Sequence, residues 1–477
     1  MNKIYLFFFL ISLNFSVAQD GTIDASFNVG TGFNGSVFSV KYTNTNNLPR
    51  VCVGGDFSTY KGGAINTFVK LFQNGNLSQN FGITGPTVAI EECSLPFSTS
   101  YPSLLTLIGG EYISGLGSYK GFQMNTTYEE TTISTNIGSG FNGRVLTIKE
   151  QSDGKILLGG WFTQFKGNSY NRIIRLNIDG TIDTSFNVGT GFDNSVHTIK
   201  QQADGKILIG GTFRNYKGLT ANGIIRLNID GSVDSSFNIG TGFNDIAHND
   251  VYSIVILADG KILVGGDFIQ FNNQTANKII CLNQDGTKNI SFNYNNNLLY
   301  GDGDVYTLVV QNDGKIIAGG TFTPQNTAMY GYKIIRLNSN GTYDNTFVTG
   351  TGFNNAIWSI DIQPDGKILI GGGFTSYNGT SVNRLIRLNN PSVLSNSDFY
   401  KSKISLYPNP VNEILNLDLS NIETIENLTI YDVTGKNVLE LKDISNHKID
   451  VSSLEKGVYI IEIKTQNGLF KEKVVKN

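Results

Sequence analysis

A Gly-Gly pair that ends an apolar run recurs seven times along the 477 residues, and it constrains the fold more than any other feature. The first glycines of these pairs are Gly54, Gly109, Gly159, Gly210, Gly265, Gly319 and Gly371. Their spacings are 55, 50, 51, 55, 54 and 52 residues. A period near 50 indicates stacked repeats, because a single unit of this kind cannot bury its hydrophobic face alone. The chain is therefore expected to fold as an array of similar units.

The repeat at residues 196–237 shows the unit most clearly. It contains four segments with strand patterning, which are Val196–Lys200, Lys206–Gly211, Ile224–Asn228 and Ser232–Phe237. Two Asp-Gly pairs between them, at 204–205 and 230–231, readily supply the positive φ values of a tight hairpin. The paired glycines permit close approach of another backbone. Four short antiparallel strands in each repeat predict the blade of a β-propeller.

The two ends of the repeat region complement each other. The last repeat stops at Arg384–Asn389 and lacks the segment that reads DGTxDxSF in other repeats. Asp20–Phe27 reads DGTIDASF and supplies this missing piece. Their pairing would hide two sheet edges that otherwise invite aggregation. We therefore predict an all-β chain in which residues 19–389 form a seven-bladed β-propeller closed by its N-terminal strand.

The repeat unit DGKILLGGxF…NRIIRLNxDGTxDxSF closely resembles the delta-60 repeat of bacterial secreted proteins. Asp153–Phe186 and Asp204–Phe237 match this unit nearly throughout, and the resemblance covers roughly Asp20–Asn389. It implies a propeller and says almost nothing about a ligand. Kelch repeats share the Gly-Gly pair but lack the DGTxDxSF segment.

The N-terminus has the features of a secretory signal peptide at residues 1–18. Lys3 precedes the ten apolar residues Ile4–Leu13, which are about half of the roughly 20 needed to cross a bilayer. Small residues end the segment at Ala18, where we expect cleavage. No Cys follows that position, so a lipid anchor is not supported. The alternative is a buried N-terminal strand or helix. Export is expected, and an integral membrane protein is not.

Residues 390–402 are polar and suit a linker, and residues 403–477 show new short strands that imply a small β-sandwich. This tail resembles the type A sorting domain of the type IX secretion system. The motifs that carry the resemblance contain Tyr407, Pro408, Asn409, Pro410, Gly435, Lys436, Gly457 and Tyr459. The resemblance implies the type IX secretion machinery as a partner and passage across an outer membrane. Removal of the tail, with release or surface attachment, would follow. An ordinary accessory sandwich is the alternative.

Composition argues against several classes of function. The formal charge is −3 and no basic block stands out, so a nucleic acid partner is not expected. Three His and three Cys, without zinc-type spacing, leave little material for a metal site, and no cofactor is predicted. Residues 177–183 loosely resemble a calcium loop but lack its closing Glu, so a hairpin turn is favoured. Cys52 and Cys93 either pair or are buried as small apolar residues.

Site candidates must come from departures between repeats, because recurring residues belong to the shared scaffold. The variable position that His197 occupies holds Phe38, Leu146, Tyr252, Tyr306 and Trp358 in other repeats, which favours packing over catalysis. At the start of the inner strands, Asp250 and Asp304 fall in neighbouring repeats, with Arg144 further round. They suit a cation, or the two carboxylates of a glycosidase, although a solvated polar rim is the simpler interpretation.

The loops between repeats and between second and third strands lie on one face, and they lengthen at 244–250, 294–304 and 324–332. Loop residues suited to stacking on sugar or peptide are Tyr216, Asn222, Tyr330, Tyr332 and Tyr377. Packing of these loops over blade edges is the alternative. We predict an exported, non-catalytic propeller that binds a glycan or protein ligand through this face, extracellularly or at the outer cell surface. A polysaccharide-degrading enzyme and a structural surface component are the alternatives.

Overall fold

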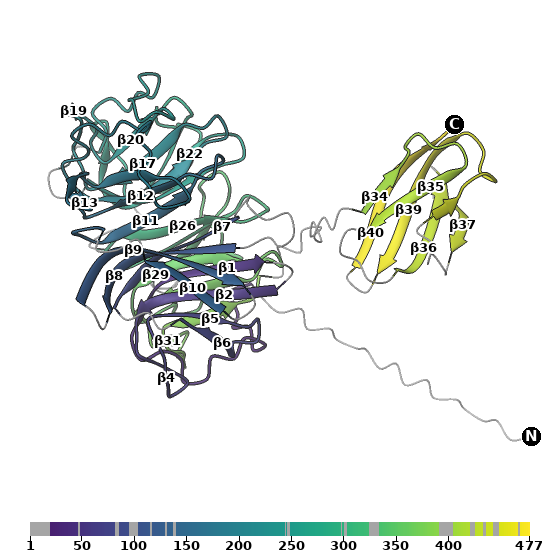
Figure 1. Cartoon of the computed structure of the whole chain (residues 1–477), viewed down its shortest axis with the longest axis horizontal. Helices are drawn as coiled ribbons and strands as arrows, with labels where there is room; N and C mark the ends of the chain where they lie inside the picture. The colour runs from purple at the N-terminus through teal and green to yellow at the C-terminus, as the bar shows by residue number, and fades with distance from the viewer. Residues whose placement is uncertain are drawn as a thin grey trace, which may run out of the picture. The chain divides into compact units, whose positions relative to one another are not determined.

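The computed structural model describes residues 20–45, 48–81, 85–94, 104–114, 117–128, 131–136, 140–243, 245, 249–296, 298–299, 303–323, 333–390, 404–419, 425–432, 436–441, 448–465 and 468–477. These residues form strands and turns and no helix (Figure 1). The chain divides into two compact units, Met1–Val393 and Leu394–Asn477. The all-β prediction is confirmed for the described part of the chain.

The first unit contains a series of antiparallel sheets, each with a first, second and third strand in chain order. The first strands are β1 (Ser36–Thr45), β7 (Thr87–Ser94), β11 (Val145–Glu150), β16 (Val196–Gln201), β21 (Asn249–Ile256), β26 (Val305–Val310) and β29 (Ile357–Ile362). The second strands are β2 (Leu48–Asp56), β8 (Leu104–Ser114), β12 (Ile156–Gly160), β17 (Ile207–Gly211), β22 (Ile262–Phe268), β27 (Ile316–Gly320) and β30 (Ile368–Gly372). The third strands are β5 (Phe68–Leu71), β9 (Gly117–Tyr128), β15 (Ile173–Leu176), β20 (Ile224–Leu227), β25 (Ile279–Leu282), β28 (Ile334–Leu337) and β33 (Leu385–Leu388).

In several repeats, a small hairpin made of two strands of two residues each connects the second strand to the third strand. They are β3 (Thr59–Tyr60) with β4 (Gly63–Ala64), β13 (Gln164–Phe165) with β14 (Asn168–Ser169), β18 (Asn215–Tyr216) with β19 (Leu219–Thr220), β23 (Gln270–Phe271) with β24 (Gln274–Thr275), and β31 (Ser376–Tyr377) with β32 (Thr380–Ser381). Each first strand contacts the first strand of the next sheet, and β29 contacts β1. The first strands are therefore innermost.

The predicted fourth strand is reduced in most described repeats. A full fourth strand is seen in β6 (Leu77–Asn80) and β10 (Thr131–Asn136), whereas elsewhere single bridges such as Leu176 to Ile182 replace it. The cause is local, because the carboxylate of Asp183 accepts hydrogen bonds from the backbone N–H and the hydroxyl of Ser185. Such an Asx turn curls the chain away from the ladder.

The first glycine of each cited Gly-Gly pair allows a side chain of the neighbouring sheet to pack closely against it. A Cβ placed on Gly159 would lie 2.5 Å from Cγ1 of Val196 in the next first strand. A Cβ placed on Gly210 would likewise lie 2.5 Å from Cγ1 of Val251. Contacts this short are incompatible with any side chain at these glycines.

A buried ion-pair network, which we call the hub, explains most of the DGTxDxSF motif. Arg175 on β15 donates from Nε to Asp183 at 2.7 Å and from Nη1 to the carbonyl of Ile229 in the next repeat at 2.6 Å. Lys155 pairs with the same carboxylate at 3.0 Å, and the guanidinium stacks 4.6 Å from the ring centroid of Phe186. The equivalent Arg, Asp and Phe form hubs at Arg226, Asp234 and Phe237, at Arg336, Asp344 and Phe347, and at Arg387, Asp24 and Phe27.

The hub carboxylates should make the propeller sensitive to acid. Burial raises the pKa of Asp344, but hydrogen bonds from Thr346 and Lys315 and the charge of Arg336 outweigh it and lower that pKa to about 2. Because the folded pKa lies below the ordinary value of 3.8, the stabilisation is complete above about pH 4 and is lost as the pH falls towards 2. The midpoint of urea unfolding is therefore expected to fall steadily between pH 4 and pH 2.

The matched control for this titration is Asp204→Asn, which removes an exposed carboxylate from a turn and should leave the pH profile unchanged. Asp344→Asn removes one hub carboxylate and should make the profile shallower. Equal slopes for the native protein and Asp344→Asn would contradict the assignment.

The second unit contains two antiparallel sheets that pack face to face as a small sandwich. One sheet contains β34 (Ile404–Tyr407), β35 (Ile414–Leu419) and β38 (Lys448–Asp450). The other contains β37 (Asn437–Leu441), β36 (Ile425–Asp432), β39 (Gly457–Thr465) and β40 (Gly468–Lys476). Leu415, Leu428, Ile430 and Ile449 are fully buried between them.

The tail motifs have distinct places in this sandwich. Asn409 donates from Nδ2 to the carbonyl of Lys473 and accepts from the N–H of Val475, so it fastens its loop to β40. Tyr407 ends β34 with its side chain exposed, and Tyr459 donates its hydroxyl to the carbonyl of Glu455. Pro408 and Pro410 are exposed beside Asn409, Lys436 precedes β37 and Gly457 begins β39. Gly435 lies outside the described residues.

Candidate functional site

Each first strand carries a β-bulge at the same position. The register shifts place one extra residue there, which is Phe38, Val88, Leu146, His197, Tyr252, Tyr306 or Trp358. A bulge disrupts the ladder locally and re-aims a side chain. The variable position noted in the sequence is therefore one where the scaffold releases a side chain from the regular strand pattern.

Five of these bulge residues form a continuous series of ring contacts, which we call the aromatic arc. The centroid distances are 5.1 Å for His197 to Tyr252, 5.0 Å for Tyr252 to Tyr306, 4.6 Å for Tyr306 to Trp358 and 6.1 Å for Trp358 to Phe38. All five side chains are partly exposed. The arc therefore offers accessible aromatic surface that spans neighbouring innermost strands.

His197 takes part in this arc as an uncharged ring. Its Nε2 lies 2.8 Å from Oγ1 of Thr212, and its ring packs edge-on against Tyr252. Burial lowers the pKa of His197 to about 4, against the smaller opposing effect of Asp250. The imidazole is therefore uncharged at neutral pH and packs as the substitution pattern predicts.

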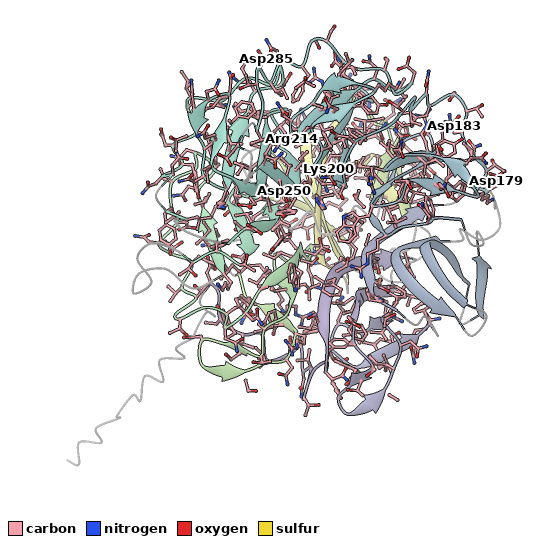
Figure 2. The ribbon with its side chains drawn as sticks, turned by 90° about the vertical axis from the view of Figure 1, so that its left-hand side faces the viewer. Asp179, Asp183, Lys200, Arg214, Asp250 and Asp285 are labelled. Atoms are coloured by element: carbon pink, nitrogen blue, oxygen red, sulfur yellow. The ribbon has the colours of Figure 1, made fainter. Side chains whose placement is uncertain are left out.

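Asp250 and Asp304 are each bonded to one of two neighbouring tyrosines within the arc. Tyr252 donates its hydroxyl to Oδ2 of Asp250 at 2.8 Å, and Tyr306 donates to Oδ2 of Asp304 at 2.8 Å. Because the two tyrosine rings contact each other, the carboxylates are joined through one hydrogen-bonded aromatic pair. In the view of Figure 2, Asp250 lies near the middle of the molecule, whereas Asp179 and Asp285 lie towards its edge.

A third carboxylate at this site was missed in the sequence. Asp267 on β22 is paired in register with Asp250 on β21, and it forms an ion pair with the buried Lys278. Burial, together with the charge of Asp267, raises the pKa of Asp304 above its ordinary value. The signal was Asp267 directly after a Gly-Gly pair, a position that holds Asp56 and Glu111 in two other repeats and Trp161, Thr212, Thr321 and Gly373 in the rest. We call the aromatic arc and these three carboxylates the inner-strand site.

Arg144 directly precedes β11, at the position equivalent to Asp250 and Asp304. Its guanidinium carbon lies 5.5 Å from the ring centroid of Trp161, which is itself 47% exposed. Arg144 and Trp161 therefore form a stacked cationic and aromatic surface in their own repeat.

The loop residues expected to contact a ligand are mostly part of the scaffold, which corrects the sequence interpretation. Tyr216 is fully buried and donates its hydroxyl to the carbonyl of Gly231, and Tyr377 is buried and donates to Gly21. Asn222 donates to the carbonyl of Thr241 at 2.8 Å and ties two loops together. These polar groups are taken up within the protein. Tyr330 and Tyr332 lie outside the described residues.

The acidic turn at Asp179 and two of the cysteines have local hydrogen-bond partners or are buried. No group of three or more His, Cys, Asp or Glu lies close enough there to hold a metal ion. The carboxylate of Asp179 accepts two hydrogen bonds from Thr181 within its own turn. Cys52 is buried near Thr43, and burial raises the pKa of the Cys281 thiol to about 11. The side chain of Cys93 is outside the described part, so the predicted pairing is untested.

Comparison with known families agrees with this architecture. Residues 405–477 match the family described as secretion system C-terminal sorting domain. Residues 151–186, 202–237, 257–292, 311–347 and 363–390 match the family described as domain of unknown function (DUF5122) beta-propeller. The chain is a β-propeller repeat protein with a secretion system C-terminal sorting domain. The sorting domain marks a protein that is secreted or attached to the cell surface. Within the described residues, no helix could cross a bilayer.

Individual relatives are similar over part of their length. Beta-agarase D of Zobellia galactanivorans is 39% identical over 74 residues, which are 15% of each chain. PorZ, an essential bacterial surface component of the type-IX secretion system of Porphyromonas gingivalis, matches with a TM-score of 0.38 and 13% identity over 97% of this chain and 60% of that one. The extracellular domain of a hybrid two component system from B. thetaiotaomicron matches with a TM-score of 0.43 and 12% identity, over 97% of this chain and 59% of that one. This chain thus spans less than two thirds of these proteins.

Proposed function

We propose that the protein is an exported, non-catalytic propeller of seven blades that binds a glycan or protein ligand through its loop-rich face, at the inner-strand site. The ring is closed by residues 20–27. Several contacts support this closure: Ile23 bridges to Leu388, and Arg387 donates to the Asp24 carboxylate at 2.7 Å. Contact between β29 and β1 is consistent with a complete ring.

The aromatic arc is the observation that carries the binding proposal. Packing within the repeats needs no aromatic residue at a bulge, since Leu146 and Val88 fill the same position elsewhere. Partly exposed rings can stack on the apolar face of a sugar or on a peptide side chain. The adjacent carboxylates of Asp250, Asp267 and Asp304 can accept hydrogen bonds from ligand hydroxyl or amide groups. Together they provide the apolar area and the directional groups that recognition requires.

A glycan array probed with the full-length protein tests this proposal. We expect a specific glycan signal that is reduced at least tenfold in Trp358→Ala and in Tyr252→Ala. The matched control is Asp204→Asn in an exposed turn, which should bind like the native protein. A blank array from folded protein would exclude the glycan branch and favour a protein ligand. A signal that both arc variants retain would contradict the inner-strand site.

One observation favours a second candidate, a polysaccharide-degrading enzyme. A glycosidase needs a carboxylic acid with a raised pKa beside a second carboxylate. Asp304 has a raised pKa and Asp250 lies beside it through the tyrosine pair. Turnover of a glycan that Asp304→Asn and Asp250→Asn both abolish would establish this alternative. Binding without turnover in the same assay would support the non-catalytic proposal.

A further inference from the structure

The repeat of β21, β22 and β25 lacks the hub that four other repeats contain. Cys281 occupies the position of the hub arginine, and Asn289 occupies that of the hub aspartate. Both charged partners are therefore absent together, so no buried charge is left without its partner. Phe292, the ring on which the arginine would stack, is retained.

The smaller side chains are accompanied by a cavity of about 330 Å³ at this position. Its lining includes Cys281, Asn289 and Phe292, together with the amides of Gln274, Asn293 and Asn296. This volume lies at the lower end of the range of about 300–1,000 Å³ that is typical of small-ligand sites. We call it the repeat-five cavity.

The lining of the repeat-five cavity is aromatic and rich in neutral hydrogen-bonding groups. The rings of Phe292 and Tyr294 are stacked, with centroids 6.5 Å apart. The Tyr294 hydroxyl is buried and has no hydrogen-bond partner among the described residues, an arrangement that costs roughly 1–3 kcal/mol. No carboxylate lines the cavity, and the ammonium of its one charged residue, Lys288, donates to the carbonyl of Thr275 at 3.1 Å.

We propose that the repeat-five cavity binds a single uncharged sugar ring. Neutral amides suit the hydroxyl groups of a sugar, and the stacked rings suit its apolar face. The cavity is separate from the inner-strand site, so this second site does not depend on the function proposed above.

Saturation-transfer NMR on the full-length protein tests the proposal with glucose, galactose, mannose and N-acetylglucosamine at millimolar concentration. We expect saturable binding of at least one of these sugars. The double variant Cys281→Arg with Asn289→Asp rebuilds the hub of the other repeats inside the cavity. It should fold normally and bind that sugar at least tenfold more weakly. Absence of binding by all four sugars, or unchanged binding by the double variant, would overturn the proposal.

A second pair of variants separates binding from folding. Asn293→Ala removes an exposed amide of the cavity lining and should weaken sugar binding five- to tenfold without loss of stability. Tyr216→Phe removes a hydroxyl that is bonded to Gly231, so it should lower the urea midpoint and leave sugar binding unchanged. Trp358→Ala should also leave this binding unchanged, because it changes the inner-strand site alone. Unchanged binding in Asn293→Ala, or loss of binding in Trp358→Ala, would contradict the placement of the sugar.

Discussion

Replacing Arg336 with alanine is expected to lower the free energy of unfolding of the propeller by about 3–5 kcal/mol. Arg336 is fully buried, and its guanidinium donates to Asp344 and to Asp20, both at 2.7 Å. It also donates to Asn390 at 2.8 Å. Alanine would remove this guanidinium from the buried carboxylates of Asp344 and Asp20, and Asp344 would keep Lys315, 3.0 Å away, as its counter-charge. Removing one partner of a buried ion pair is costly because the remaining charge cannot regain its water.

Urea unfolding of the full-length protein measures this effect, with Asp204→Asn as the exposed control that should change stability by less than about 0.5 kcal/mol.

The native repeat of β25 suggests a compensating change, since it has Cys281 and Asn289 in place of the ion pair. We therefore expect Arg336→Cys with Asp344→Asn to be more stable than Arg336→Cys alone. A double variant that is less stable than the single one would contradict the hub as an electrostatic unit.

The repeat architecture could be predicted from the sequence because its constraints are local and recur. Close packing at Gly159 excludes a side chain wherever the same approach occurs, so glycine appears at a constant spacing. Asp230-Gly231 similarly marks a turn, and Gly231 has a φ of 81°. A local requirement that is repeated several times leaves a periodic pattern, which one sequence is enough to reveal.

The sequence predicts a longer fourth strand than most repeats contain, because one residue in that segment has two roles. Asp183 belongs to an alternating segment, which favours a strand, but its carboxylate also bonds back to Ser185 and to Arg175. The side-chain bonds compete with the ladder and reduce the strand to a single bridge at Ile182. The pattern of polar and apolar residues alone does not show which of these bonds forms.

The candidate site was predicted in part, and the missing part depends on contacts between strands. Asp250 and Asp304 were recognised because they depart from the repeat at one equivalent position. The ion pair between Asp267 and Lys278 was not predicted. It joins a residue near the end of β22 to a loop residue with a positive φ of 64°, and the repeat pattern does not show that these two residues meet. Tyr216 was expected to contact a ligand, but the loop that carries it folds back and buries the ring.

Deleting residues 403–477 is expected to abolish export across the outer membrane and to leave the propeller in the periplasm. The deleted segment is a complete sandwich with its own buried core, so the propeller should fold without it. Fractionation of the native host, with immunodetection of the propeller in the periplasm and culture medium, measures the result. Normal export of the truncated chain would contradict the role of the tail.

A point variant tests whether export depends on the folded sandwich. Asn409→Ala removes two hydrogen bonds that fasten its loop to β40, and it should lower the stability of the tail by about 1–3 kcal/mol. Partial retention in the periplasm is then expected, because a larger fraction of tails is unfolded at any time. Asn437→Ala, at an exposed residue of β37, is the matched control and should be exported normally. Export of Asn409→Ala at the native level, despite a measurably less stable tail, would show that a linear motif is recognised instead of the folded domain.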